Sequence, residues 1–533
     1  MIRLSRAGTD TLLSTSFYYV TGANFEDAAA TYDLADDKLI LWIPSAGSAR
    51  DVLYSGRPPT RAECEAITDV DQVRNIGELD DYLRESLFGR FPPGGTLYIL
   101  DPAHVPGAVN TIHLHPRFAR RDRLASPDLL YGAGFDPSAM QPKVDSTSLR
   151  PAMDRARVRK TPYEVAQIRR ANAVSGDAHR AVLERLARMA SERDVEAVFL
   201  ATSIRAGARS QAYAPIAGSG ENASMLHYSA NADPLADRTL LVLDAGAEWA
   251  CYASDVTRTL PLAPAGFPPA AQRVYDAVAR MQAAALALVR PGRRFLALQA
   301  AATVVAADAL RTLGLLRGPL PDILRTGVVA AFFPHGLGHH VGLEVHDVLS
   351  RELLGYAAET HDPPVAGTPR RRAAAPRGKR QLVDPSWCAE VVRIGAAGVA
   401  DGGPVVRDVL EADMVVTIEP GMWVPLPPPL FFSVLLSSLY PSPFLLVTET
   451  RRPANPRPPT QLLQPRLHPR GVPQGRALRK PDRRRGFRRV LLCWRCADRG
   501  RHPRHGERVR ESDHGTHGGR GLEDHPARVR VTM

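Results

Sequence analysis

The sequence predicts an α+β protein with two folded domains and a C-terminal segment of different character, and three observations lead to this prediction. Short β-like runs alternate with helical stretches over residues 1–155. Long helical stretches and strand pairs follow over 156–422, and both periodicities stop after Met422. A chain of 533 residues, 44% of them hydrophobic, is long enough to bury a core in each domain.

The first domain is predicted to be α/β. Its β-like runs are FYYVTG (17–22), KLILWIP (38–44) and TLYIL (96–100), which are rich in the aromatic and β-branched residues that favour strands. The stretch IGELDDYLRESL (76–87) has the apolar spacing of a helix instead. Alternation of this kind is typical of an α/β domain.

The second domain is predicted to open with a helix. TPYE at 161–164 places threonine at the N-cap, proline at the first helical position and glutamate three residues after the cap, which is a capping box. The elements expected to follow are a strand–turn–strand run at 239–262, helices at 269–289 and 295–313, and a strand at 414–422. A basic, Pro- and Ala-rich insertion at 366–380 is expected to be an exposed loop.

The basic net charge of the chain, formally +12, belongs to its C-terminal segment alone. Residues 451–533 hold 22 Lys and Arg against 7 Asp and Glu, whereas residues 1–450 hold 46 against 49. Only one of the 22 is a lysine, Lys480, although a functional nucleic-acid-binding arm should mix Lys with Arg. We therefore expect no nucleic-acid partner.

The cysteine content and the apolar runs bear on the compartment. Five cysteines make a sparse, odd set, which favours a reducing compartment over a disulfide framework. The stretch MIRLSRAGTDTLL at 1–13 lacks an apolar run of signal-peptide length. The apolar run at 430–447 has the length of a membrane helix, but Pro441 and Pro443 lie inside it. We therefore expect a cytoplasmic protein with no membrane partner.

Two aspartates of the second domain are candidates for a metal site. Asp244 ends the apolar run LLVL, and Asp255 is expected to begin the return strand of the same hairpin. Residues near the turn can face each other across a ladder, and two carboxylates facing each other repel unless a cation lies between them. The alternative is that each aspartate caps a turn.

A histidine-rich segment and a glutamate strengthen the metal hypothesis. His335, His339, His340 and His346 lie among glycines and apolar residues, and neutral imidazoles are common metal ligands. A solvated histidine-rich loop is the alternative. Glu419 lies in the apolar run VVTI, where a carboxylate is costly to bury without a partner. Such an oxygen-rich set suits Mn²⁺, with Co²⁺ or Zn²⁺ as alternatives.

These segments resemble the Xaa-Pro aminopeptidase/Xaa-Pro dipeptidase (prolidase) family of "pita-bread" metallopeptidases. The similar motifs are HYSAN (227–231), DAGAEWACYASDVTRT (244–259), PHGLGHHVGLEVHD (334–347) and VVTIEPGM (415–422). The segment at 17–44 also resembles the family's non-catalytic N-terminal domain. The resemblance implies a non-catalytic α/β domain over residues 1–155 and a pita-bread catalytic domain over 156–422.

The resemblance also implies roles for single residues. The family has two metal ions per subunit, here expected to be Mn²⁺, held by five protein ligands. Four of these ligands map onto Asp244, Asp255, His339 and Glu419. The histidines that line the substrate pocket and assist proton transfer map onto His227, His335 and His346.

The fifth ligand, a glutamate in a strand of the type VGGVRIEDD, does not occur after Met422. Read one nucleotide out of frame, however, the codons for residues 493–506 can spell this strand. We interpret the chain from about residue 471 onward as family sequence in the wrong reading frame, preceded by a translated intron. Residues 423–533 are accordingly expected to be disordered and non-native.

The activity implied by the resemblance is that of an Xaa-Pro aminopeptidase. Such an enzyme hydrolyses the peptide bond before a proline at position 2 of small peptides, with water activated by two metal ions. Two alternatives stay open: an Xaa-Pro dipeptidase, and a family member that is inactive because the fifth ligand is missing. A homodimer is compatible with the resemblance.

Overall fold

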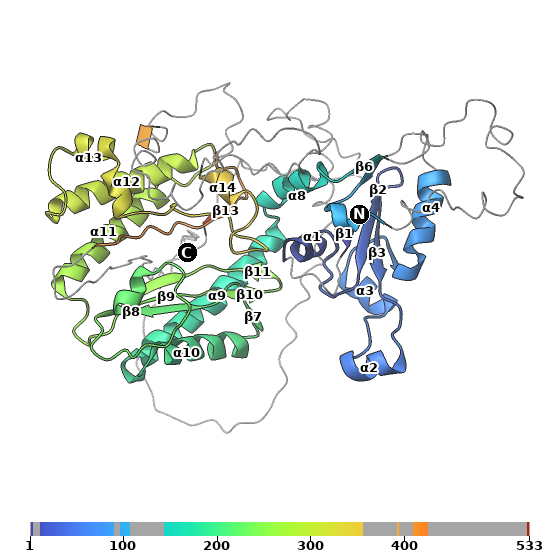
Figure 1. Ribbon diagram of the computed structural model, residues 1–533, viewed down its shortest axis with the longest axis horizontal. Helices are drawn as coiled ribbons and strands as arrows, with labels where there is room; N and C mark the ends of the chain where they lie inside the picture. Colours follow the sequence, from blue (N-terminus) through green and yellow to red (C-terminus); the bar gives the residue numbers. More distant parts are fainter. Residues whose placement is uncertain are drawn as a thin grey trace, which may run out of the picture.

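A computed structural model gives the fold and describes residues 2–3, 11–89, 96–106, 143–354, 392–393, 409–424 and 530–531. In Figure 1 the N-terminal part, drawn in blue, lies beside a larger part that runs from teal to yellow. Helix α8 (Leu149–Val158) lies between the two parts. Residue 155, the predicted domain boundary, falls inside this helix.

The N-terminal part is built on a four-stranded sheet with the strand order β1-β2-β3-β4. Strand β3 alternates between two cores, because Ile40 and Trp42 pack with α4 whereas Leu41 packs with α1. The elements of this part are α1 (Thr11–Thr21), α2 (Ala49–Ser55), α3 (Arg61–Ile67), α4 (Leu79–Gly89), β1 (Ile2–Arg3), β2 (Ala29–Asp33), β3 (Lys38–Ile43), β4 (Gln72–Asn75), β5 (Thr96–Tyr98) and β6 (Lys143–Asp145).

One of the predicted strands of this part is wrong. FYYVTG is helical, since Phe17 to Thr21 form the second half of α1. All four side chains from Phe17 to Val20 are buried. A short segment buried on every side loses the periodicity that separates helix from strand, so its composition predicted the wrong element. The other assignments are confirmed: KLILWIP and TLYIL contain β3 and β5, and the predicted helix contains α4.

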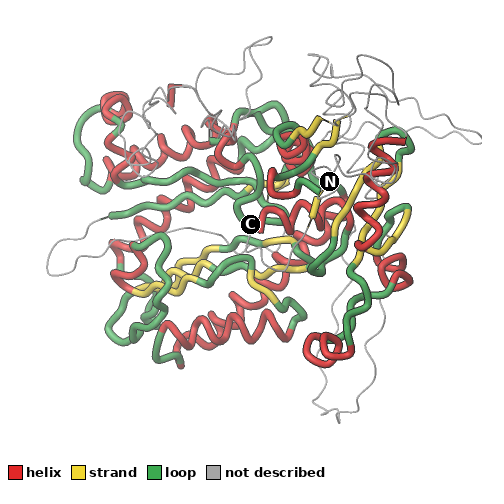
Figure 2. The backbone as a smooth tube through the Cα atoms, turned by 45° about the vertical axis from the view of Figure 1, so that its right-hand side comes forward, coloured by secondary structure: helices red, strands yellow, loops and turns green. Residues whose placement is uncertain are grey.

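In the larger part, antiparallel strands lie between two layers of helices (Figures 1 and 2). Strand β9 is apolar on both faces, so each face is covered by helices: Leu240 and Val242 pack toward α11 and α12, whereas Leu241 and Leu243 pack toward α9 and α10. The helices are α9 (Pro162–Arg185), α10 (Glu192–Arg205), α11 (Pro269–Leu286), α12 (Phe295–Thr312), α13 (Leu320–Thr326) and α14 (Ser350–Leu353). The strands are β7 (Ser210–Gln211), β8 (Ile216–Ser219), β9 (Leu240–Asp244), β10 (Ala247–Trp249), β11 (Tyr252–Ala253), β12 (Thr257–Pro261), β13 (Val415–Val416) and β14 (Arg530–Val531).

Local signals predicted this part well. The capping box at the start of α9 is present: Glu164 N donates to Thr161 Oγ1 at 3.3 Å, and Thr161 N donates to Glu164 Oε2 at 2.7 Å. Both predicted helices match α11 and α12 to within a few residues at each end. The strand predicted at 414–422 is shorter, because only Val415 and Val416 form β13; beyond it, Thr417 N and Glu419 N still donate to backbone oxygens of the histidine segment.

Helix α12 is the single described helix that is long and apolar enough to cross a membrane, at a mean hydropathy of 1.2. Of the residues in this window 61% are buried, and they pack against α11 in the main core. Helices inside a protein core pass the same test, so this feature is weak evidence for a membrane span. The apolar run at 430–447 lies outside the described residues.

Most of the C-terminal segment predicted to be disordered, 425–529, lies outside the described residues, as does the insertion at 366–380. The described residues of the predicted segment differ from that prediction: Arg530 and Val531 form β14 and pair in parallel with β13, and Trp423 and Val424 pack in the main core. The reading-frame hypothesis stays a prediction.

Candidate metal centre

The pairing of β9 with β12 brings the two candidate aspartates together. Asp244 is the last residue of β9 and pairs with Thr257, the first residue of β12. Asp255 comes two residues before Thr257 and so precedes the return strand; the prediction that it begins this strand is wrong. The connection is also longer than a simple turn, because it forms a second hairpin from β10 and β11.

A glycine lets the two aspartate-bearing segments approach each other. A Cβ atom on Gly246 would lie 1.9 Å from the backbone oxygen of Ser254, so no larger residue fits without moving the backbone. Ala245 N donates to Val256 O at 3.0 Å in the same crossing. Asp244 and Asp255 are the neighbours of these residues, and their carboxylates are therefore held side by side.

The Tyr213 hydroxyl lies between the two carboxylates, 2.5 Å from Asp244 Oδ1 and 3.1 Å from Asp255 Oδ1. Burial raises the pKa of Asp244, and the negative charge of Asp255 raises it further, to about 8. Burial and both carboxylates also raise the pKa of Tyr213 well above its usual value, so the phenol stays a hydrogen-bond donor. The two carboxylates share one neutral donor, and a cation bound between them would offset their mutual repulsion.

The histidine segment and the glutamate segment run side by side in opposite directions. Thr417 N donates to His339 O at 2.9 Å, and Glu419 N donates to Leu337 O at 2.8 Å. A Cβ atom on Gly338 would lie 2.2 Å from Thr417 O, so glycine is needed at this close approach. The pairing places His339 and Glu419 on neighbouring segments that both face the aspartates.

His339 is the centre of the cluster. Its Nε2 atom lies 3.0 Å from Asp255 Oδ2 and 3.0 Å from Glu419 Oε1. This nitrogen is buried, and it makes no aligned hydrogen bond among the described residues. Burial alone would lower the pKa of His339, but the carboxylates of Glu419 and Asp255 raise it well above its usual value. A nitrogen aimed between two carboxylates in this way has the arrangement of a metal ligand.

Glu419 is held by its own strand neighbour. Thr417 Oγ1 donates to Glu419 Oε1 at 2.6 Å, while His339 N donates to Thr417 Oγ1 at 3.0 Å. Burial would raise the pKa of Glu419, but the charge and hydrogen bond of His339, with the Thr417 hydroxyl, lower it to about 2. The glutamate is therefore an anion at neutral pH, as a ligand must be.

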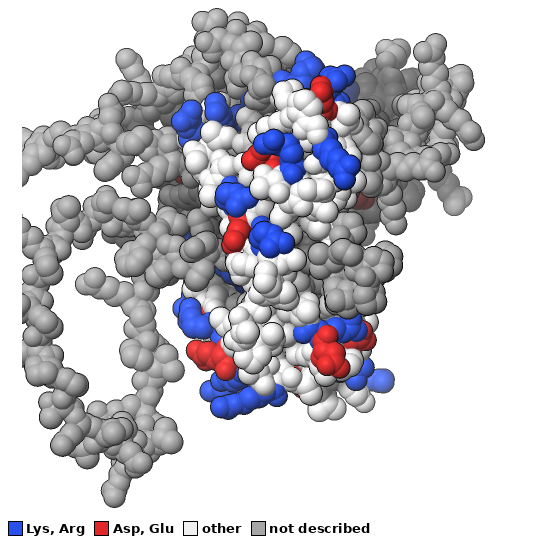
Figure 3. Space-filling model, turned by 90° about the vertical axis from the view of Figure 1, so that its left-hand side faces the viewer, with Lys and Arg blue, Asp and Glu red and all other residues white. Residues whose placement is uncertain are grey.

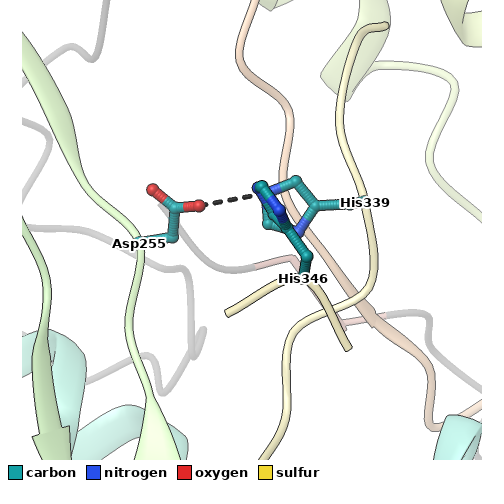
Figure 4. Close-up of side chains that lie close together, drawn as sticks. All are labelled: Asp255, His339 and His346. Atoms are coloured by element: carbon teal, nitrogen blue, oxygen red, sulfur yellow. Dashed lines mark ion pairs between the residues drawn. The ribbon is translucent and has the colours of Figure 1, made fainter. Parts of the chain in front are cut away.

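His346 completes the described donor group. Asp255, His339 and His346 each offer one ligand atom, and these atoms lie within 4.8 Å of one another. Figure 4 shows the two imidazole rings beside each other, with Asp255 facing them from the opposite segment. The rings of His339 and His346 meet edge to face at 4.3 Å between centroids. Burial, followed by the charge of His339, lowers the pKa of His346, which favours its neutral form.

The other two predicted histidines lie around this group. His335 stands between Phe333 and Trp423, with each ring centroid 5.0 Å away, and its Nε2 atom is buried without a hydrogen bond among the described residues. Burial lowers the pKa of His335, so it too favours the neutral form. His227 is exposed, and its charge bears on the pKa of His346, which places it at the open side of the cluster.

The described residues fit a divalent cation. Asp244, Asp255 and Glu419 supply carboxylate oxygens and His339 supplies Nε2, a donor set suited to Mn²⁺, Co²⁺ or Zn²⁺. The arrangement corresponds to the four ligands predicted for a two-metal site. Sequence reasoning missed Tyr213 and Thr417. Thr417 carried a signal, since alternate residues of an extended segment share one face, but Tyr213 carried none.

Comparisons with known proteins agree with this geometry. Residues 166–434 match metallopeptidase family M24, and residues 13–91 match the N-terminal domain of aminopeptidase P. A probable Xaa-Pro aminopeptidase of Pyricularia oryzae is 44% identical over 407 residues, covering 76% of this chain and 70% of that protein. A probable Xaa-Pro aminopeptidase of Colletotrichum graminicola is 45% identical over 411 residues, covering 76% and 71%.

Solved structures show the same fold. Aminopeptidase P from E. coli, in its low-pH form, superposes with a TM-score of 0.57 at 24% identity, covering 79% of this chain and 82% of that chain. Proline aminopeptidase P II from Yersinia pestis gives a TM-score of 0.56 at 25% identity, with the same coverage. The predicted α+β fold, an N-terminal domain followed by a pita-bread catalytic domain, is confirmed. On these grounds, and on the carboxylate and histidine cluster, the chain belongs to metallopeptidase family M24.

Proposed function

We propose that the protein is an Xaa-Pro aminopeptidase that hydrolyses the bond before a proline at position 2 of small peptides. The observation that carries this proposal is the approach of Asp255 and Glu419 to the Nε2 atom of His339, in a chain similar to relatives named Xaa-Pro aminopeptidases. No observation favours the dipeptidase alternative over this activity.

Two divalent cations are proposed as cofactors, with Mn²⁺ first and Co²⁺ or Zn²⁺ as alternatives. The support is the predominance of carboxylate oxygens over nitrogen donors, because Mn²⁺ prefers oxygen ligands. A cation bound here would polarise the substrate carbonyl and lower the pKa of water. Asp244, Asp255, His339 and Glu419 would hold it.

The surrounding histidines would donate hydrogen bonds to the negative charge that develops on the substrate and assist proton transfer. His335 and His346 both have pKa values lowered by burial, so at neutral pH each ring has one N–H donor and one acceptor nitrogen. A neutral imidazole beside the scissile carbonyl can donate a hydrogen bond to the oxygen as negative charge develops. The exposed His227, at the open side of the cluster, would contact the substrate as it enters. Glu419, an anion held by Thr417, can accept a proton and return it to the proline nitrogen.

The fifth ligand is the remaining question for activity. We propose that a glutamate encoded out of frame between residues 493 and 506 fills this place in the correctly read chain. The support is the match of shifted codons to the strand that the family requires. Sequencing spliced mRNA across the codon for Met422 tests this, and a cDNA that encodes the present chain would refute it.

We also propose a cytoplasmic enzyme without nucleic-acid or membrane partners. Cys64 and Cys251, the two cysteines among the described residues, are not disulfide-bonded, which suits a reducing compartment. On the face shown in Figure 3, Lys and Arg are interspersed with Asp and Glu and form no continuous basic patch. A homodimer is compatible with the exposed apolar side chains Leu53 and Tyr54 on α2.

The activity test compares substrates and metals on one protein. The full chain and its frame-corrected form are purified, stripped of metal and supplied with Mn²⁺, Co²⁺ or Zn²⁺. Release of the first residue is then measured from Xaa-Pro-Xaa, Xaa-Pro and Xaa-Ala-Xaa peptides. The proposal expects cleavage of Xaa-Pro-Xaa peptides by the frame-corrected form and loss of cleavage in its His339→Asn variant. Equal cleavage of Xaa-Ala-Xaa peptides would refute it, and Mn²⁺ binding without cleavage by either form would indicate an inactive family member.

A further inference from the structure

Behind the histidine segment lies a buried group of charges that the proposed chemistry does not use. Arg157, Lys160 and Asp347 are 1%, 2% and 2% exposed, and Glu344 is partly buried beside them. Arg157 comes from the end of α8, and Lys160 lies just before α9. Asp347 directly follows His346 in the chain. Buried charges are costly unless they are paired and hydrogen-bonded, so the contacts within this group must be closely defined.

The contacts of Asp347 fix its carboxylate at both oxygens. Arg157 Nη2 donates to Oδ1 at 2.7 Å, and Lys160 Nζ donates to Oδ2 at 2.8 Å. Lys160 Nζ also donates to the backbone oxygen of Arg157 at 2.7 Å. A Cβ atom on Gly342 would lie 2.2 Å from Asp347 Oδ2, so the loop is wrapped closely around the carboxylate.

The backbone of Asp347 connects this group to the metal centre. Asp347 N donates to the backbone oxygen of His340 at 2.9 Å. The same oxygen lies 2.9 Å from His339 Nδ1. Because a carbonyl oxygen only accepts, Nδ1 must donate to it, which leaves Nε2 to face Asp255 and Glu419. One backbone oxygen thus sets the ring orientation of His339, and it would keep the remaining proton on Nδ1 when a metal binds Nε2.

The N-terminal part reaches the same group. Thr15 Oγ1, on α1, donates to Glu344 Oε1 at 2.8 Å, and Arg157 Nη2 donates to that oxygen at 3.0 Å. Arg157 therefore binds both carboxylates of the loop, Glu344 and Asp347. The histidine loop is therefore tied to α1 and to the α8–α9 junction.

We propose that Asp347 is a positioning residue for the metal centre: anchored by Arg157 and Lys160, it holds the His340 carbonyl that orients His339. The inference rests on the proposed function, because it assumes that His339 Nε2 is a metal ligand. Groups that orient a metal ligand through its second ring nitrogen typically change metal affinity when they are lost. Asp347 touches neither metal nor substrate in this proposal.

The test is Asp347→Asn in the full chain, with Mn²⁺ affinity measured by isothermal titration calorimetry. We expect the Mn²⁺ dissociation constant to rise roughly 10- to 100-fold. Because this variant leaves an unbalanced buried cation and can fail to fold, the charge-balanced pair Lys160→Met with Asp347→Asn is measured as well. The balanced variant should fold and show the same direction of change.

The matched control is Glu192→Gln, which removes the charge of another fully buried carboxylate. Glu192 accepts from Ser219 N at 2.7 Å and Asp233 N at 2.9 Å and contacts none of the four predicted ligands. This variant should lose thermal stability and keep the Mn²⁺ affinity of the parent chain. A folded Asp347 variant with parental affinity, or an equal loss in Glu192→Gln, would overturn the positioning role.

A second readout needs no metal. In the metal-free chain labelled with ¹⁵N-histidine, the Nδ1 proton of His339 should be protected from exchange with water, and Asp347→Asn should remove the protection. If the parent chain shows this protected proton but binds no Mn²⁺, the proposed metal function fails while the positioning role stands. If the protection is the same in both chains, the positioning role is wrong.

Discussion

Asp244 and Asp255 share one hydroxyl group, that of Tyr213, which lies 2.5 Å from the first carboxylate and 3.1 Å from the second. The two aspartates come from segments 11 residues apart that meet where β9 and β12 pair. Tyr213 is therefore the common donor of the two carboxylates. The relationship makes Tyr213 the first residue to test outside the predicted ligand set.

Tyr213→Phe removes this donor and keeps the ring. We expect Mn²⁺ affinity to fall roughly 10- to 100-fold, as is usual when a group that hydrogen-bonds to metal ligands is lost. Calorimetric titration with Mn²⁺ measures the change. Tyr228→Phe is the control, because its hydroxyl donates to Glu192 at 2.8 Å and touches no predicted ligand. Equal losses in the two variants would contradict a specific role for Tyr213.

Thr417 is expected to matter through its hydroxyl. Thr417→Val keeps the shape of the side chain but removes the donor to Glu419 Oε1 and the acceptor for His339 N. Mn²⁺ affinity should fall roughly 10- to 100-fold, because both a carboxylate ligand and the histidine segment lose their anchor. Thr417→Ser restores the hydroxyl and should restore most of the affinity. A serine variant as weak as the valine variant would show that the methyl group, and not the hydroxyl, is what matters.

Because His179 is buried, we expect the folded chain to lose stability in acid. This histidine is buried on α9 with its Nε2 atom 3.0 Å from Ala245 O, and burial lowers its pKa to about 4. A base whose folded pKa lies below its unfolded value, near 6.5, contributes stability above pH about 6.5 that is lost as pH falls toward about 4. The contribution at stake is roughly 3 kcal/mol of unfolding free energy.

The measurement for His179 is chemical denaturation of the metal-free chain at about pH 7 and about pH 4.5. The parent should lose more unfolding free energy between the two values than His179→Gln, which keeps a donor for Ala245 O. Comparing the two chains removes the contributions of other buried histidines, since these are common to both. An identical pH dependence in parent and variant would mean that His179 is not held neutral.

The parts of the fold that could be predicted are those with a local cause. The Thr161 capping box marks the start of α9 because its two hydrogen bonds join residues three apart. The four candidate ligands drew attention in the sequence because carboxylates in apolar strands are costly without a partner and neutral histidines are common metal ligands. His339 does meet both Asp255 and Glu419, which lie 84 and 80 residues away from it in the sequence.

The parts that could not be predicted depend on which segments meet in space. The run from Phe17 to Val20 is buried on every side, so its pattern could not separate helix from strand. Tyr213 and Arg157 look like ordinary aromatic and charged residues until their partners, Asp244 and Asp347, are placed beside them. Their roles come from contacts between segments far apart in the chain, which no local spacing encodes.

Gly338 gives the most direct test of the site's backbone. A Cβ atom there would lie 2.2 Å from Thr417 O and 2.8 Å from Thr417 Oγ1. Making room requires the histidine and glutamate segments to separate, which breaks the hydrogen bonds from Thr417 N to His339 O and from Glu419 N to Leu337 O. Gly338→Ala should therefore lower the unfolding free energy by about 3 kcal/mol and abolish Mn²⁺ binding.

Gly176→Ala is the matched control for this substitution, since Gly176 lies within α9 and a Cβ atom there would meet nothing within 4 Å. Alanine in a helix interior should stabilise the chain by roughly 0.5–1 kcal/mol and leave Mn²⁺ affinity unchanged. Urea denaturation and calorimetric titration of both variants measure the contrast. The positions of the candidate ligands His339 and Glu419 depend on the close approach of their two segments at Gly338. If Gly338→Ala kept the stability and Mn²⁺ affinity of the parent, this close approach would not be needed for the metal centre.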